Sequence, residues 1–227
     1  MKSFFSPDSI PMKALTLFCD LWFLNMAFIF CSLPIFTIGA SATALYSIIF
    51  KRLRGEEISV FKMFFAEFRA NFKQSTLFWI PYMLICLFLA ADVYISHNIL
   101  PDEFRFLQYP TSIALFVIVF CSVLVFPQMA LFNSKTGQII KNSAILSIVN
   151  FPVTFMVIIL HIFILLLSGL SPKARVMTLS LLFFFGFAAL AYFCSIFYRR
   201  IFLKALKKES SSENGENPDE DDEEPLI

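Results

Sequence analysis

Four long runs of apolar residues in the later part of the chain alternate with short polar connections. A helix rises about 1.5 Å per residue, so about 20 apolar residues are needed to cross the hydrocarbon core of a bilayer. The connections contain turn formers or charges, as in "NILPDEFRFLQYP" and "SPKAR". The pattern therefore predicts four membrane-spanning helices, at about 76–97, 111–132, 151–170 and 176–198.

The first apolar run, from Ala14 to Phe50, is long enough for nearly two further crossings. Pro34 and Gly39 mark the natural point for a break, because proline lacks a backbone donor and glycine loosens a helix. We expect helices at about 14–33 and 37–53, and one long kinked helix is the alternative. The chain then has six membrane helices, or five if the first run crosses once.

The segment "PIFTIGASATALY" at 34–46 gathers small and hydroxylated residues inside that run. Three interpretations compete: a signal-peptide cleavage site, a glycine loop for phosphate, and a seam of close helix packing. The preceding apolar run is longer than the roughly 7–15 residues of a signal peptide, which argues against cleavage. All six glycines are isolated, so no phosphate-loop motif is present. Small residues four apart let helices approach closely in a membrane. We therefore predict a helix-packing seam at Gly39, Ala40, Thr43 and Ala44.

Residues 58–73, "ISVFKMFFAEFRANFK", repeat their apolar positions with a helical period. One side carries phenylalanines, namely Phe61, Phe64, Phe65, Phe68 and Phe72. The other side carries basic residues, namely Lys62, Arg69 and Lys73. The pattern predicts an amphipathic helix at the membrane interface. Such a helix either anchors the protein in lipid or against its own core, or it docks a cytoplasmic partner.

The composition excludes a soluble domain, because 58% of the residues are hydrophobic, 31 are Phe and only 15% are charged. The predicted fold class is all-α: a polytopic transmembrane helical bundle of six, alternatively five, membrane helices plus the amphipathic interfacial helix, within residues 1–208. Residues 209–227 hold nine of the seventeen acidic residues and no aromatic residue. Such a segment buries too little apolar surface to offset its ordering entropy. We expect an acidic, disordered tail.

Basic residues set the predicted orientation of the chain in the membrane. Residues 1–208 carry 18 basic and 8 acidic side chains, and the basic ones gather within 51–73 and 199–208. Positive charge near spans stays on the cytoplasmic side. We therefore predict a multi-pass protein of the cell membrane whose carboxyl terminus is cytoplasmic. Six crossings place the amino terminus inside and five place it outside. Lys173 and Arg175, in the expected outer loop, depart from the rule.

Four polar side chains lie within the predicted spans and are candidates for an intramembrane polar site: Asp20, Asn25, Asp92 and His161. Asp20 and Asp92 lie within about 9 Å of a helix end by helix rise, and structural pairing is favoured over ion coupling for both. His161 lies near the middle of its span. A neutral histidine bonded to a neighbouring helix is the simpler interpretation, and a proton relay is the alternative. A transporter would use His161, Asn25 and the break in the first apolar run to form a substrate or ion site near the midplane.

Motifs for catalysis and for metal or nucleotide binding are absent from the sequence. There is no H-E-x-x-H and no G-x-S-x-G. The two histidines, His97 and His161, belong to separate predicted helices. The five cysteines all lie in apolar segments and form no C-x-x-C pair. We expect a protein that is not an enzyme, holds no cofactor or metal, and binds no nucleic acid.

The amino-terminal third combines four recognisable stretches: "FFSPDS" at 4–9, "LPIFTIGASATALY" at 33–46, "RGEE" at 54–57 and "FRANFKQSTLFW" at 68–79. Together these resemble the YesL-like family of bacterial integral membrane proteins, a family of unknown function. The resemblance is specific over residues 4–80 and general, in length and hydropathy, to about 206. It implies a small polytopic protein of a kind often encoded beside sugar transport systems and polysaccharide-degradation genes, and it supplies no site residues.

Two functions follow as hypotheses. The leading one is an accessory or regulatory component in the lipid bilayer that works with a carbohydrate ABC transporter or a sensing protein. The runner-up is a small transporter in its own right. A transporter places polar side chains and broken helices around a midplane site. An accessory protein presents surfaces to a partner, for which the basic amphipathic helix and the acidic tail are the candidates.

Overall fold

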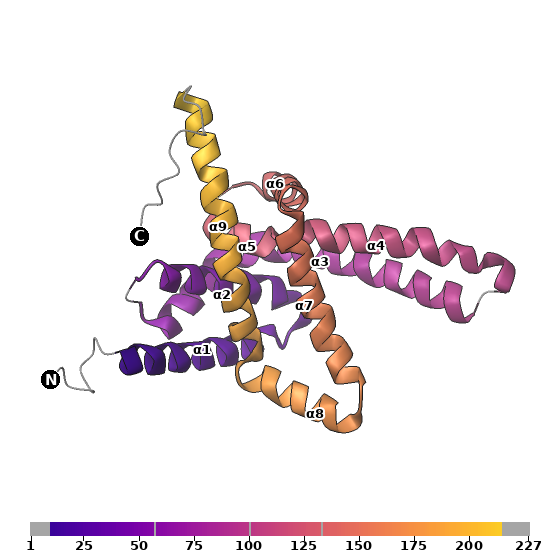
Figure 1. The fold of residues 1–227 in the computed structure, drawn as a ribbon, viewed down its shortest axis with the longest axis horizontal. Helices are drawn as coiled ribbons and strands as arrows, with labels where there is room; N and C mark the ends of the chain where they lie inside the picture. The colour runs from indigo at the N-terminus through magenta and orange to yellow at the C-terminus, as the bar shows by residue number, and fades with distance from the viewer. Residues whose placement is uncertain (1–9, 57, 100, 133, 215–227) are drawn as a thin grey trace.

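The computed structural model describes residues 10–56, 58–99, 101–132 and 134–214 (Figure 1). This part of the chain is helical, with short connections and no strand. The elements are, in chain order, α1 (Ile10–Ser32), η1 (Ile35–Thr37), α2 (Ile38–Leu53), α3 (Val60–Asn98), η2 (Asp102–Leu107), α4 (Gln108–Ser122), α5 (Val125–Leu131), α6 (Thr136–Val149), α7 (Phe151–Gly169), α8 (Pro172–Leu181), the π-helical turn η3 (Leu182–Gly186) and α9 (Phe187–Asn214).

Five helical stretches of the described chain are long and apolar enough to cross a membrane. They are Met12–Ser32, Val60–Asn98, Glu103–Leu131, Phe151–Gly169 and Pro172–Leu203. The predicted span 37–53 forms α2, whose 16 residues are buried over most of their length. At the rise of a helix it is about 24 Å long, shorter than the hydrocarbon core. The predicted all-α, multi-pass membrane class is confirmed, with five long apolar helices and one short buried helix.

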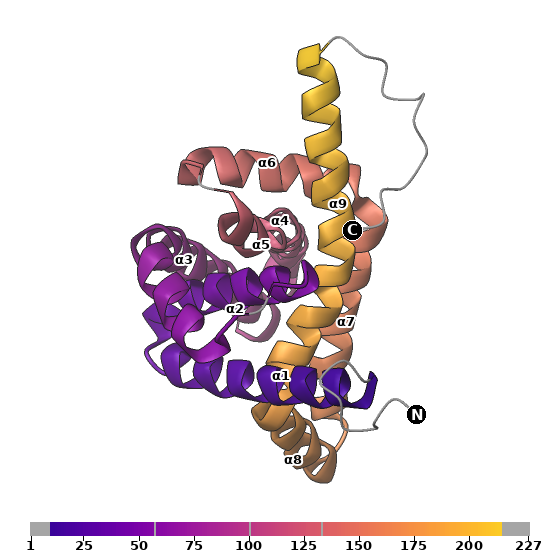
Figure 2. The same ribbon diagram turned by 90° about the vertical axis from the view of Figure 1, so that its left-hand side faces the viewer.

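The helices run in two main directions. The α3–α4 hairpin projects to the right in Figure 1 and is seen end-on in Figure 2. In both views α7 and α9 run from top to bottom, with α8 between them at the bottom and α6 at the top. The short helix α2 lies at the centre, where it contacts α1, α3, α5 and α9. The hairpin therefore lies across the direction of α7 and α9.

Two clusters of buried side chains surround α2. In the first, Ile48 of α2 packs with Leu24 of α1 and Phe64 of α3. In the second, Phe50 of α2 packs with Tyr198 of α9. Lipid tails are as apolar as these side chains, so the clusters gain stability from close packing rather than from leaving water. The helices α1, α3, α5 and α9 are therefore held together in part through their contacts with α2.

The helix α3 joins two predicted elements, the amphipathic segment 58–73 and the span 76–97. Polar residues at 74–76 suggest a boundary, but none of them is a Gly or Pro that would break a helix. Gln74 and Ser75 bond elsewhere in the protein instead. Gln74 Nε2 donates to the carbonyl oxygen of Ser134 at 2.7 Å, and Ser75 Oγ lies 2.8 Å from Thr43 Oγ1. The predicted boundary is corrected: both segments form one helix of 39 residues.

Other predicted boundaries also change. The span 111–132 is divided into α4 and α5, because Pro127 cannot donate to the carbonyl of Val123 and its ring would clash with that oxygen. The span 176–198 contains parts of α8 and α9 with η3 between them. Residues 209–214 of the predicted disordered tail are helical, as the end of α9. The rest of that tail, 215–227, lies outside the described residues.

Candidate functional site

The predicted seam residues lie where α2 packs against its neighbours. Both alanines and Thr43 are fully buried. A Cβ atom on Gly39 would lie 2.7 Å from Trp79 Cβ and 2.9 Å from the Ser75 carbonyl oxygen. Carbon atoms do not pack that closely, so α3 can approach α2 here because residue 39 has no side chain. Thr43 Oγ1, 2.8 Å from Ser75 Oγ, adds a hydrogen bond across the same contact.

The break between α1 and α2 is closed by hydrogen bonds. Thr37 Oγ1 lies 2.6 Å from the carbonyl oxygen of Pro34 and 2.5 Å from that of Cys31. Trp79 Nε1, from α3, donates to the carbonyl oxygen of Ile35 at 2.8 Å. These donors satisfy carbonyls that a helix end leaves without intrahelical partners. The break is thus a turn that is bonded to α3.

Two ion pairs join α2 to its neighbours at one end. Asp20 of α1 pairs with Arg52 of α2. One residue earlier in α2, Lys51 Nζ lies 2.6 Å from Glu67 Oε1 of α3. The four side chains are between 16% and 23% exposed. Partial burial strengthens the attraction but also removes water from both charges, so losing one partner is costly. Asp20 therefore has a charged partner inside the protein.

Asn25 of α1 is fully buried and binds the backbone of the π-helical turn η3. Its Nδ2 donates to the carbonyl oxygens of Leu182, at 3.1 Å, and Phe183, at 2.6 Å. Its Oδ1 accepts from the backbone N–H of Ala188 at 3.0 Å. A π-helical turn interrupts the regular ladder of an α-helix, and each unpaired backbone group in an apolar medium is costly. Asn25 therefore supplies the missing bonds where η3 meets α9.

Asp92 and His161 bond to different partners. Thr111 Oγ1 of α4 donates to Asp92 Oδ2 of α3 at 2.8 Å, within the hairpin. His161 Nδ1 lies 2.7 Å from the carbonyl oxygen of Val157 on the same helix. Because a carbonyl oxygen only accepts, Nδ1 is the donor in this hydrogen bond. The expected bond from His161 to a neighbouring helix is thus a bond within α7. Among the residues that the structure describes, no three His, Cys, Asp or Glu lie together as metal ligands.

The first turns of α3 carry the predicted amphipathic pattern. On the phenylalanine side, Phe64 is fully buried in the core beside α2, Phe61 is 61% exposed, and the others are half-buried, namely Phe65, Phe68 and Phe72. The opposite side carries three exposed basic residues, Lys62, Arg69 and Lys73, called here the basic side of α3. The phenylalanines thus fasten this segment to the protein core, and the basic side faces outward.

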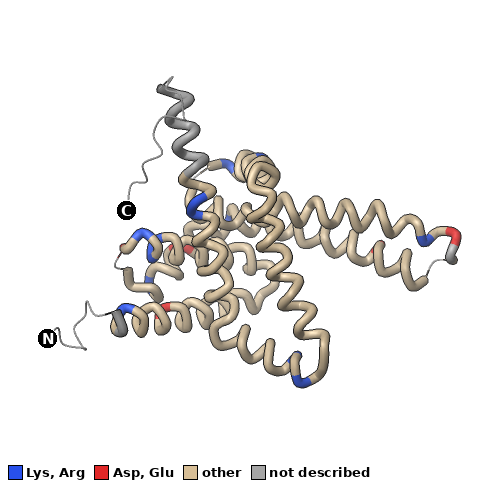
Figure 3. The backbone as a smooth tube through the Cα atoms, viewed as in Figure 1, with Lys and Arg blue, Asp and Glu red and all other residues tan. Residues whose placement is uncertain are grey.

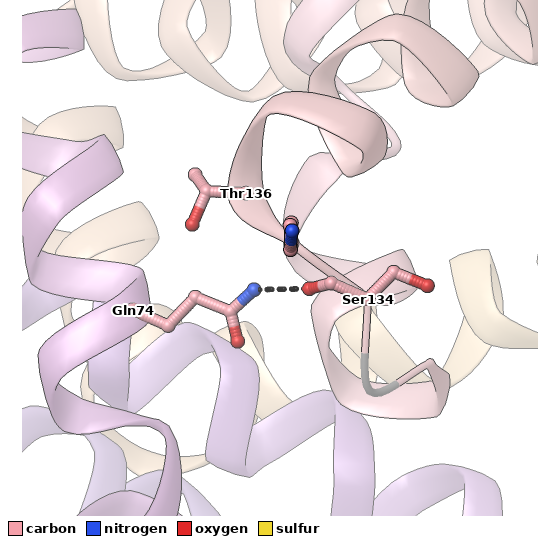
Figure 4. Close-up of a pocket in the computed structure, with 4 residues that line it drawn as sticks. Gln74, Ser134 and Thr136 are labelled. Carbon is pink, nitrogen blue, oxygen red and sulfur yellow. Dashed lines mark hydrogen bonds between the residues drawn. The ribbon is translucent and has the colours of Figure 1, made fainter.

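A shallow polar cleft of about 480 Å³ lies between α3 and the start of α6 (Figure 4). It is lined by Gln74 of α3 and by the start of α6 with the residues before it, namely Ser134, Lys135 and Thr136. Figure 4 shows the bond from Gln74 to the Ser134 carbonyl that joins the two parts. Lys135 is the one cationic residue among the described residues that line the cleft. Sequence patterns gave no sign of it, because its two parts are about 60 residues apart.

A second, apolar cavity of about 610 Å³ lies between α2, the α3–α4 hairpin, α5, α7 and α9. Trp79, Tyr82 and Phe126 form an aromatic wall of it, and His161 contributes to the lining. No charged Asp, Glu, Lys or Arg is found among the described residues that line it. His161 is therefore the one member of the predicted polar set that borders this cavity.

The two basic clusters of the chain lie at the same end of the molecule. Arg199 Nη1 of α9 donates to the carbonyl oxygen of Leu53, at the end of α2, at 3.1 Å. Figure 3 shows Lys and Arg gathered over this region, whereas the α3–α4 hairpin and α7 carry few charges except near their tips. This contact joins the end of α2 to α9. That both clusters share one side of the membrane, and that this side is the cytoplasm, stay predictions.

Sequence analysis missed the acidic partner within the basic segment. Glu67 is the single acidic residue between 58 and 73, and that isolation is a signal for an ion pair. Glu67 forms an ion pair with Lys51. It also accepts a hydrogen bond from the side-chain amide of Asn71, whose Nδ2 lies 3.3 Å from Glu67 Oε2. Glu67 thus links α3 to α2 from within its otherwise basic segment.

Comparison with known proteins finds a likeness at the amino-terminal end. Residues 21–93 match the model of a family described as "Protein of unknown function, DUF624". The matched part runs from α1 into α3. It includes the seam, the basic side of α3, Glu67, which pairs with Lys51, and Arg52, which pairs with Asp20. No curated protein and no solved structure matches the chain. These comparisons therefore assign no activity, and the link to YesL-like proteins and sugar transport stays a prediction.

Proposed function

We propose that this protein is a non-enzymatic accessory or regulatory component of carbohydrate uptake in the cell membrane. It acts by contact with a carbohydrate ABC transporter or a sensing protein. The observation that carries this proposal is the exposed basic side of α3, fastened to the core by phenylalanines on its opposite side. The carbohydrate part rests on the sequence resemblance, because similar proteins are often encoded beside sugar transport systems.

The basic side of α3 has the form of a docking surface. Lys62, Arg69 and Lys73 are two turns and one turn apart, a stripe roughly 16 Å long by helix rise. None of the three has an ion-pair partner among the described residues. Exposed charges of one sign steer association with a surface of opposite charge and raise its rate. The stripe therefore suits a partner that presents acidic side chains.

The partners of the intramembrane polar residues favour this function over transport. A transporter needs polar groups near the midplane that are free to bind its substrate. Asn25 uses both amide hydrogens and its oxygen on backbone groups. Asp20 is paired with Arg52, and Asp92 accepts from a threonine. The remaining group, His161, borders the apolar cavity, and it keeps a small stand-alone transporter as the second candidate.

The test is charge reversal on the basic side with Lys62→Glu and Arg69→Glu together. We expect the variant to insert and to unfold at the wild-type temperature, because both side chains are exposed. It should lose a partner that copurifies with wild type in mild detergent and is identified by mass spectrometry. Growth on a complex carbohydrate should fall as it does when the gene is deleted. The matched control is Lys62→Arg with Arg69→Lys, which keeps the charges and should keep the partner.

Salt dependence gives an independent measurement of the same contact. Charges are screened over about 10 Å at 0.1 M salt and about 3 Å at 1 M, so copurification should weaken as salt is raised. Equal recovery of partner by wild type and the charge-reversed variant would contradict docking by α3. Saturable uptake of a sugar or ion by the purified protein alone in liposomes, abolished by His161→Ala, would replace the proposal with the transporter.

A further inference from the structure

The apolar cavity runs from a buried floor to an exposed rim. Tyr198 and Val157 at the floor are each 1% exposed, whereas Phe116 and Leu165 at the rim are 43% and 69% exposed. Along α4 the lining extends over residues 112–122, roughly 15 Å by helix rise. The rim residues belong to α4 and α7, whose stretches are long and apolar enough to cross a membrane. The cavity is therefore an elongated groove that opens toward the lipid-facing side of these helices.

The lining of the groove suits hydrocarbon. The Trp79 ring centroid lies 5.9 Å from that of Tyr82 and 6.0 Å from that of Phe126, which makes a continuous aromatic wall. Aliphatic side chains of α4 and α7 contribute much of the remaining lining, and none of the described lining residues is charged. A hydrocarbon gains dispersion contacts along such a wall. The polar groups of the lining are uncharged hydroxyl, indole and imidazole groups, set among a larger apolar surface.

We propose that this groove binds one acyl chain of a phospholipid from the surrounding bilayer. The chain enters at the rim between α4 and α7, lies along the aromatic wall of Trp79 and Tyr82, and ends near Tyr198. The volume of about 610 Å³ falls within the range of small-ligand sites, roughly 300–1,000 Å³. This binding site is separate from the docking surface on α3, and neither proposal depends on the other.

Size and polarity exclude other occupants. A saccharide buries many hydroxyl groups, each of which is costly without a hydrogen-bond partner. The described lining contains no carboxylate, amide or guanidinium to receive them, and Trp79 Nε1 and His161 Nδ1 are already bonded to backbone carbonyls, which leaves mainly the Tyr and Ser hydroxyls. A whole helix is too large, because a cylinder about 10 Å wide and 15 Å long occupies roughly 1,200 Å³, about twice the volume of the groove. A single acyl chain is narrow, apolar and already abundant at the rim.

The test uses Trp79 as a reporter of the bound chain. The sequence has two tryptophans, so Trp22→Phe leaves Trp79 alone. The full chain carrying this substitution is purified in detergent and titrated with phosphatidylcholine whose acyl chains are brominated, because bromine quenches indole fluorescence on contact. We expect saturable quenching. Adding Val119→Phe, which fills the groove from α4, should raise the apparent Kd roughly tenfold, since its ring displaces part of the chain.

Val117→Phe is the matched control. Val117 lies on the same helix, is 50% exposed and does not line the groove, so its variant should bind as wild type does. If Val119→Phe impairs folding, Ser112→Phe at the rim is compared with Ala114→Phe outside it in the same titration. Equal apparent Kd values for lining and control variants would overturn the proposal, as would quenching that does not saturate. Protection of Trp79 by maltose but not by unbrominated phosphatidylcholine would show a saccharide site instead.

Discussion

Gly39→Ala should destabilise the protein, although alanine is the better helix former. The added Cβ would lie 2.7 Å from Trp79 Cβ, 2.9 Å from the Ser75 carbonyl oxygen and 3.2 Å from Phe126 Cε1. The phenylalanine ring can turn aside. The other two atoms belong to the backbone of α3 or lie next to it, so they move only if α3 moves. The substitution therefore separates α2 from α3 along the seam.

The size of the effect follows from two opposing contributions. Overpacking a well-packed site costs about 1–3 kcal/mol, and two contacts below 3.0 Å place Gly39→Ala near the upper end. Replacing glycine by alanine inside a helix returns about 1 kcal/mol. The net loss is about 2 kcal/mol. For a chain of this length each kcal/mol shifts the unfolding midpoint by about 2–4 °C, so the midpoint should fall by about 4–8 °C.

The measurement is thermal unfolding of the purified protein in detergent, followed by circular dichroism. Gly137→Ala in α6 is the control, because no heavy atom lies within 4 Å of its added Cβ. The control adds no clash, and because residue 137 is the second residue of α6 it gains only part of the helix-interior propensity, so its midpoint should rise by less than about 2–4 °C. The two substitutions thus shift stability in opposite directions. If Gly39→Ala is as stable as Gly137→Ala, the seam does not pack against α3 and this reasoning is wrong.

Three further outcomes are expected. Asn25→Leu should lower the free energy of unfolding by about 2–4 kcal/mol in the same assay, because three backbone groups lose their partner. An unchanged midpoint would show that the bonds from Asn25 do not stabilise η3. A double-mutant cycle of Asp20→Asn and Arg52→Gln should give a coupling of about 0.5–3 kcal/mol, and additive losses would contradict the ion pair. Single cysteines at Ser59 and Ser211, in a background without native cysteines, should resist membrane-impermeant thiol reagents in intact cells, and labelling from outside would reverse the proposed orientation.

The sequence alone was sufficient to predict the features that depend on residues close together in the chain. The predicted span 151–170 corresponds to α7, Phe151–Gly169, because the length of an apolar run between turn formers is a local property. The break after Pro34 and the two-sided pattern of 58–73 are local in the same sense. The difference in net charge between residues 1–208 and the acidic tail follows from composition alone, so it can be recognised without the structure.

Tertiary structure decided which elements continue and which groups become partners. Residues 74–76 look like a boundary, yet α3 passes through them because Gln74 and Ser75 bond to segments distant in the chain. Asn25 lies 157 residues before Leu182, whose carbonyl it binds, and no spacing rule connects the two. The apolar groove is assembled from six helices, α2, α3, α4, α5, α7 and α9. Side-chain partners depend on the path of the whole chain, because a buried polar group bonds to whichever backbone or side chain the packing of helices brings within reach.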